Sequence, residues 1–189
     1  MIRYSLSYPI LTGLRLLRSV RQPEPGFRIL LFHDVPVPFL DAFEKLVIYV
    51  VKNHGVIAPG EAASWLDGRP IPAISGAKWK MPCLFSFDDG FSSNFNMAEM
   101  ILRRHGIKAL FFVAPGLIKL SGEEQRKAIV TRIFQGRIKL EQIDQNFRLM
   151  NWEELARLKQ QGHVIGCHGM LHRRLSELNG EILREEVIN

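Results

Sequence analysis

The sequence predicts an α/β protein built from parallel strands and crossover helices, and three observations lead to this prediction. Short apolar segments recur along the chain. Between them lie segments with helical patterning, several of which end at a glycine. This alternation is typical of parallel sheets, because two parallel strands need a long connection that is usually a helix. Two clusters of Asp and His also directly follow apolar segments, at the strand ends where α/β proteins gather their functional groups.

The expected elements follow one another in a simple order. Strands are predicted at residues 28–32, 81–85, 108–113 and 164–167. Helices are predicted at residues 39–53, 92–105, 152–161 and 175–187, with a further basic helical stretch inside residues 115–147. Gly55 and Gly106 close the first two helices. Met150 and Trp152 are expected in the core.

Two parts of the chain are distinguished, an arm of residues 1–26 and a domain of residues 27–189. The arm is apolar and basic, ends at Pro23 and Pro25, and lacks the cleavage-site pattern of a secretory signal. Two interpretations are open: a short helix packed on the domain, or a helix lying on a membrane surface. The predicted location is therefore the cytoplasm, with peripheral membrane contact under the second interpretation.

The composition predicts one soluble domain with a core of its own. The chain has 189 residues, of which 47% are hydrophobic and 23% charged, and no apolar run is long enough to span a bilayer. The net charge of +6 favours an acidic glycan or an anionic membrane surface as partner. No nucleic-acid-binding motif is recognised, so nucleic acid is not expected. Cys83 and Cys167 lie in apolar strands, as buried thiols in a reducing compartment or as a disulfide between adjacent strands.

The segment Ser86-Phe87-Asp88-Asp89-Gly90 is the most informative part of the chain. Two neighbouring carboxylates at the end of a buried strand are unfavourable unless each has a cationic partner or a metal ion. Gly90 lets the backbone bend, so that both carboxylates can face one pocket. One carboxylate would bind a cation, and the other would accept or donate a proton. The alternative is a solvated acidic turn, since Asp and Gly are ordinary turn residues.

His168 and His172 form the second cluster, at the exit of the last predicted strand. A spacing of four places two imidazoles on one side of a helical turn, roughly 5–6 Å apart at Cβ, within reach of one ion. The alternative is a pair of surface histidines at chance spacing. His163 lies at the entrance of the same strand, the wrong end for chemistry.

These two segments resemble the motifs of a known family, the polysaccharide deacetylases (carbohydrate esterase family 4, with the NodB homology domain). Residues 86–90 resemble its (T/S)-F-D-D-G motif, and residues 168–172 resemble its H-(S/T)-x-x-H motif. Position 169 differs from the family motif, because it is Gly where the family carries Ser or Thr. The side-chain hydroxyl that could support the metal ligands by a hydrogen bond is therefore missing. The resemblance runs from about Phe27 to the end of the sequence.

The resemblance implies an irregular (β/α) barrel, of which this chain is expected to hold about the first two thirds. The later family motifs, an Arg-containing strand and a Leu-x-His segment, have no counterpart before Asn189. An incomplete barrel leaves strand edges unpaired, so self-association through open sheet edges is expected.

The resemblance also implies a mechanism, the hydrolysis of N-acetyl groups on an amino-sugar-containing polysaccharide or glycan. One divalent metal ion would be held by Asp89, His168 and His172. Zinc is the expected ion, with cobalt, manganese and nickel as alternatives. Asp88 would act as the general base. Two further interpretations stay open: a catalytically inactive remnant that binds metal or carbohydrate, and a metal-free scaffold.

His33 is the candidate general acid. Some family members with a rearranged motif order carry Tyr-His-x-(Val/Ile) at the first strand, and Phe32-His33-Asp34-Val35 resembles this, with Phe in place of Tyr. The alternative is a strand-end histidine bonded to a backbone carbonyl.

A basic segment in the middle of the chain has two interpretations, a solvated helical face or a lid that grips an anionic or lipid-linked glycan. Its cations are Arg126, Lys127, Arg132, Arg137 and Lys139.

Overall fold

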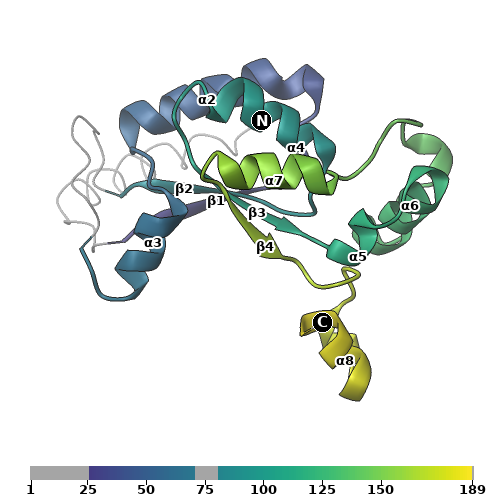
Figure 1. Cartoon of the computed structure of the whole chain (residues 1–189). Helices are drawn as coiled ribbons and strands as arrows, with labels where there is room; N and C mark the ends of the chain where they lie inside the picture. Colours follow the sequence, from purple (N-terminus) through teal and green to yellow (C-terminus); the bar gives the residue numbers. More distant parts are fainter. Residues whose placement is uncertain (1–25, 71–80, 189) are drawn as a thin grey trace, which may run out of the picture.

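A computed structural model describes residues 26–70 and 81–188 of the protein. The described residues contain one sheet of four parallel strands in the order β1-β2-β3-β4 (Figure 1). The strands are β1 (Arg28–Phe32), β2 (Cys83–Phe87), β3 (Leu110–Val113) and β4 (Val164–Cys167). The predicted α/β class with parallel strands is therefore confirmed. The N-terminal arm lies outside the described residues, apart from Gly26, and both interpretations of it stay predictions.

The helices connect the strands, and three of them lie over one face of the sheet (Figure 1). In Figure 1, α2, α4 and α7 lie together over one face, α3 lies on the other side, and α8 extends away at the C-terminal end. The α-helices are α2 (Leu40–Asn53), α3 (Pro59–Leu66), α4 (Ser92–Met97), α5 (Pro115–Ile118), α6 (Gly122–Ala128), α7 (Trp152–Gln160) and α8 (Gly180–Val187). Two π-helical segments, Ala98–Leu102 and Ile129–Ile133, continue α4 and α6, and 3-10 turns occupy Val37–Phe39, Leu140–Gln142 and Leu175–Glu177.

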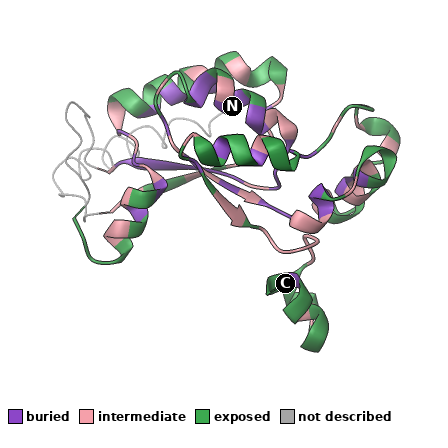
Figure 2. Ribbon diagram, viewed as in Figure 1, coloured by how far each residue is buried: buried purple, intermediate pink, exposed green. Residues whose placement is uncertain are grey.

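The core lies between the sheet and the helices α2, α4 and α7. Every residue of β2 is buried, as is typical of a central strand in a parallel sheet (Figure 2). Phe87 stacks on Phe111 of β3 with ring centroids 5.1 Å apart, and on Phe32 of β1 at 5.4 Å. Phe43 of α2 packs edge-on against Phe32 at 5.2 Å. Pairs of this kind contribute about 0.5–1.5 kcal/mol each beyond their buried area, so the aromatic row holds the register at the carboxyl end of β1 and β2.

The opposite face of the sheet is only partly covered. Ile29 and Leu31 of β1 are 58% and 53% exposed, and Val164 of β4 is 44% exposed. Within the described residues, β1 and β4 each pair with one strand only. Within residues 26–70 and 81–188, this face of the sheet is therefore partly exposed, and no further strand pairs with the outer edges of β1 and β4.

Three details differ from the sequence-based predictions. Cys167 is exposed, although Cys83 is buried as expected, and both thiols are free. The disulfide between adjacent strands is excluded because β3 lies between β2 and β4. Trp152 is 52% exposed and not part of the core, since α7 makes its core contacts further on, through Leu155 and Leu158. Met150 is fully buried, as predicted.

The helix α3 was not predicted, although the sequence carries a signal for it. Pro59 occupies the first helical turn, and the carboxylate of Glu61 accepts a hydrogen bond from the backbone N–H of Ala58 at 2.6 Å. Proline at the start of a helix and a Glu that reaches back to the preceding N–H are both helix-start signals. The predicted helix at 175–187 is shorter than expected and begins at Gly180. Among the described residues, no helix combines the length and the apolar character needed to cross a membrane.

Candidate metal centre

The site lies at the carboxyl edge of the sheet, where β2 and β4 end. Asp88 and Asp89 follow β2 directly, and His168 follows β4 directly. Asp89 and Gly90 both have left-handed backbone conformations, with φ of 69° and 77°. The bend therefore begins at Asp89 itself, a residue that tolerates this region better than most. Any side chain at position 90 would be strained, because its Cβ would lie 2.9 Å from Cγ1 of Val113.

The ligand atoms of Asp89, His168 and His172 converge. Oδ1 of Asp89 lies 3.2 Å from Nε2 of His172 and 3.6 Å from Nε2 of His168. One ligand atom from each of the three residues lies within 4.8 Å of the other two. Asp89 is only 3% exposed, and burial of a lone carboxylate is unfavourable without a cation beside it. One carboxylate and two imidazoles, with further positions free for water and substrate, is a donor set that suits a catalytic zinc ion.

Asp88 lies beside this group without belonging to it. Its Oδ2 is 3.9 Å from Nε2 of His168. Burial raises the pKa of Asp88, the positive forms of His168 and His33 oppose that shift, and the charge of Asp89 adds to it. The pKa of His172 is raised as well, chiefly by its hydrogen bond with Asp89. The two adjacent carboxylates therefore sit in different environments, which is a requirement for different roles.

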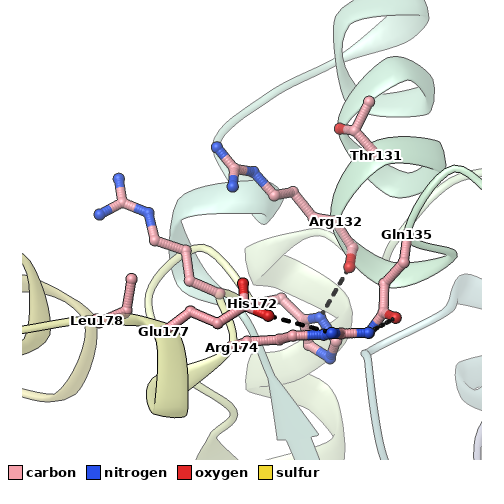
Figure 3. Close-up of a pocket in the computed structure, with 8 residues that line it drawn as sticks. Thr131, Arg132, Gln135, His172, Arg174, Glu177 and Leu178 are labelled. Atoms are coloured by element: carbon pink, nitrogen blue, oxygen red, sulfur yellow. Dashed lines mark hydrogen bonds and ion pairs between the residues drawn. The ribbon is translucent and has the colours of Figure 1, made fainter.

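The ring of His172 is oriented by a second contact. Its Nδ1 lies 3.2 Å from the backbone oxygen of Arg132, in the π-helical segment that follows α6 (Figure 3). Donation from Nδ1 leaves Nε2 directed at Asp89. Partners of this kind determine which nitrogen of a histidine faces a metal ion.

The loop that carries both histidines is held by a buried glutamate of the last helix. Oε1 of Glu186 accepts hydrogen bonds from the backbone N–H groups of Leu171 and Arg173, both at 3.0 Å. The backbone oxygen of Glu186 accepts a third, from Met170 at 2.9 Å. Glu186 is 1% exposed. These bonds bracket His172, whose φ of 54° is unfavourable for a residue with a large side chain.

Glu186 also accounts for the glycine at position 169. Gly169 has a φ of 78°, and a Cβ there would lie 2.6 Å from Oε1 of Glu186. The departure from the family's Ser or Thr therefore has a structural reason in this chain. On the other side of the loop, Gly116 of α5 donates its N–H to the oxygen of Met170 at 2.8 Å. The loop is held from both sides by backbone contacts.

His33 lies at the carboxyl end of β1, next to β2, and is exposed. Its backbone oxygen accepts a hydrogen bond from Nδ2 of Asn94 at 2.6 Å, and the hydroxyl of Ser93 donates to the neighbouring Asp34. Its ring makes no hydrogen bond within residues 26–70 and 81–188, and its charge acts on Asp88. The role of general acid stays a prediction.

His163 lies where the sequence places it, at the entrance of β4, and its role is structural. It is 3% exposed, and its Nδ1 accepts a hydrogen bond from the N–H of Ala109 at 3.1 Å. Burial is the main reason why its pKa is lowered to about 4.

The basic segment is mostly a solvated surface. Lys127, Arg137 and Lys139 are exposed, and Lys127 pairs with Glu123 at 2.6 Å. Arg132 differs, because it also lines a cavity beside His172. Sequence reasoning missed Glu186 and the arginines that follow His172, since nothing in the local pattern links them to the site.

Comparison with known proteins identifies the family. Residues 79–189 match the family model described as polysaccharide deacetylase. The chain therefore belongs to the polysaccharide deacetylase family, and the resemblance stated from its two motifs is confirmed. None of the curated proteins compared with the sequence matches it.

Several solved structures share the fold. A deacetylase of Streptococcus pyogenes, PplD in complex with acetate, is 20% identical with a TM-score of 0.58, over 85% of this chain and 63% of that chain. IcaB from Ammonifex degensii is 21% identical with a TM-score of 0.55, over 79% of this chain and 55% of that chain. The BpsB deacetylase domain from Bordetella bronchiseptica is 22% identical with a TM-score of 0.51, over 78% of this chain and 58% of that chain. The chain thus spans between 55% and 63% of the length of these three structures.

Proposed function

We propose that this chain is the metal-binding part of a hydrolase that removes N-acetyl groups from an amino-sugar-containing glycan. The observation that carries the proposal is the convergence of Asp89, His168 and His172, with a second carboxylate, Asp88, beside them. Membership of the polysaccharide deacetylase family supports the substrate class.

In the proposed reaction, Asp89, His168 and His172 would hold one divalent ion, for which zinc fits best. When bound, the ion would lower the pKa of a water molecule and polarise the acetyl carbonyl. Asp88 would accept the proton of the attacking water on its carboxylate, since it faces the site and is not one of the three converging residues. The backbone oxygen of Arg132 would keep His172 oriented. His33 would donate a proton to the departing amine.

The test measures metal content and acetate release together. We expect the purified chain to bind one zinc or cobalt ion and to release acetate from N-acetylated oligosaccharides. Asp88→Asn should keep the metal and lose turnover, and Asp89→Asn should lose both. Asp41→Asn, an exposed carboxylate on α2, is the matched control and should keep both. Metal binding that survives Asp89→Asn would contradict the proposed ligand set.

A second candidate function is an inactive remnant that binds metal or carbohydrate. The observation that favours it is that His33, the candidate general acid, is exposed and that its ring makes no hydrogen bond within residues 26–70 and 81–188. It predicts stoichiometric metal without acetate release from any substrate of the panel. An ion that binds the folded chain raises its melting temperature. If neither zinc nor cobalt changes the melting temperature, metal binding is refuted, and a carbohydrate-binding remnant or a metal-free scaffold is left.

A further inference from the structure

A cavity of about 410 Å³ opens directly beside the candidate metal centre. It lies between the Ile129–Ile133 segment and the chain that follows His172 (Figure 3). Its lining consists of Thr131, Arg132, Gln135, His172, Arg173, Arg174, Glu177 and Leu178. The volume falls in the range of about 300–1,000 Å³ that is usual for small-molecule sites. His172 belongs both to this lining and to the converging triad, so a ligand in the cavity would lie next to the reaction centre.

The lining carries an excess of positive charge. Only Arg174 has a hydrogen-bonded acidic partner, Glu177 at 3.1 Å, and it also donates to Gln135 (Figure 3). Arg173 forms ion pairs with Glu186 at 3.8 Å and with Glu185 at 3.9 Å. The guanidinium of Arg132 has no acidic partner among residues 26–70 and 81–188. The guanidinium of Arg132 is therefore the group at this cavity that is available to a ligand.

This arrangement suits an anion better than a neutral sugar. Cations gathered around one cavity repel one another, and a negatively charged ligand relieves that repulsion. A guanidinium presents two parallel N–H groups that match the oxygens of a carboxylate or a phosphate. Among the described residues that line the cavity there is no Phe, Tyr or Trp, the side chains on which the face of a neutral sugar usually stacks.

Arg132 connects the cavity to the candidate centre. Its backbone oxygen orients His172, while its side chain lines the cavity (Figure 3). In Figure 3 the guanidinium of Arg132 points away from the Arg174–Glu177 pair, so it is not engaged there.

We propose that this cavity binds an anionic group, a carboxylate or a phosphate, on the glycan close to the acetylated sugar. The inference rests on the proposed function and specifies its substrate class as an acidic glycan. Arg132 is the residue that contacts the anion. Arg173 is paired with Glu185 and Glu186, Arg174 is paired with Glu177, and both shape the rim.

The test compares matched acidic and neutral probes by calorimetric titration of the full chain at low ionic strength. A tetrasaccharide of alternating glucuronic acid and N-acetylglucosamine is paired with neutral chitotetraose. N-acetylglucosamine 6-phosphate is paired with N-acetylglucosamine, which separates a phosphate preference from a carboxylate preference. At least one acidic probe should bind about ten times more tightly than its neutral partner, as expected for hydrogen bonds to a charged group.

Two variants with the same change in net charge make the test specific. Arg132→Gln should weaken binding of the preferred acidic probe about tenfold and leave the neutral probe unchanged. Lys139→Gln removes an exposed cation of the same segment that does not line the cavity, and should change binding by less than about twofold. Circular dichroism verifies that each variant is folded.

The outcomes separate this inference from the proposed function. Equal affinity for acidic and neutral probes, or an equal loss in Arg132→Gln and Lys139→Gln, overturns the acidic subsite even if acetate is released. Tight binding of an acidic probe that depends on Arg132 supports the subsite even if no acetate is released, in which case the proposed activity fails alone.

Discussion

Replacement of Glu186 by Ala should loosen the loop that carries both candidate histidine ligands. Glu186 is 1% exposed, and its Oε1 accepts two backbone hydrogen bonds, from Leu171 and Arg173. Alanine would leave both N–H groups without an acceptor, and a buried donor without a partner costs about 1–3 kcal/mol. Part of this cost is offset, because Oε2 of Glu186 is buried without a hydrogen bond among the described residues, and alanine removes this unfavourable burial. We therefore expect a loss of about 2–4 kcal/mol in the free energy of opening this loop.

Amide hydrogen exchange measures this loss directly, because the loop can open without unfolding the whole domain. A loss of about 2–4 kcal/mol corresponds to exchange faster by roughly 30-fold to 1,000-fold at Leu171 and Arg173. The same variant should bind zinc or cobalt less tightly, while amides of β2 keep their protection.

Two matched variants distinguish the proposed contact from a general effect of charge. Glu186→Gln keeps an oxygen that accepts both N–H groups, so most of the protection should be retained. Glu185→Ala removes the exposed neighbouring carboxylate and should change stability by less than about 0.5 kcal/mol. Unchanged exchange at Leu171 and Arg173 in Glu186→Ala, or an equal effect of Glu185→Ala, would show that Glu186 does not hold this loop.

Three further predictions follow from the same structure. Gly169→Ser restores the residue type of the family, but it should destabilise the protein by about 1–3 kcal/mol in urea unfolding, since its Cβ would lie 2.6 Å from Oε1 of Glu186 at a φ of 78°. Gly60→Ala, which has open space and no positive φ, is its control, and equal stability of the two variants would contradict the clash. His163 has a pKa lowered to about 4, so the buried neutral ring contributes stability that is complete above its ordinary pKa of 6.5 and is lost as the pH falls toward 4. Urea unfolding should show a decline of about 1–3 kcal/mol over this window, and His163→Gln should remove this part of the slope. Zinc at 100 times its Kd should stabilise the chain by about 2.7 kcal/mol, an effect that a chelator reverses and Asp89→Asn abolishes. If zinc raises the melting temperature of Asp89→Asn as much as that of the unchanged protein, the metal binds at another site.

The strands were predictable because their signal is local. Buried parallel strands read as short apolar runs, and β1 and β4 have the predicted bounds. The order β1-β2-β3-β4 also follows from short crossover connections. Prediction was weaker where exposure depends on distant parts of the chain, as for Cys167 and Trp152. Cys167 ends an apolar segment and Trp152 is a large apolar residue, but both side chains are exposed in the folded structure.

The candidate site also has features that local sequence signals predict and features that depend on distant parts of the chain. The sequence predicted that Asp89, His168 and His172 are neighbours, because parallel strands bring their carboxyl ends to one edge. It did not predict that Asp89 and His172 themselves adopt left-handed backbone conformations, with φ of 69° and 54°. At His172 this conformation is held by Glu186 of α8, which accepts hydrogen bonds from the N–H groups of Leu171 and Arg173. No residue near His172 in the sequence indicates these contacts.

Apolar segments, turn residues and ligand types are properties of short segments, so the amino-acid sequence was enough to predict which chemical groups lie at the ends of the strands. The surroundings of those groups became visible only in the folded chain. Glu186 reaches the histidine loop from α8, the backbone of Arg132 orients His172, and three arginines line one cavity. Such contacts join residues far apart in the chain, and their geometry depends on how the helices pack against the sheet.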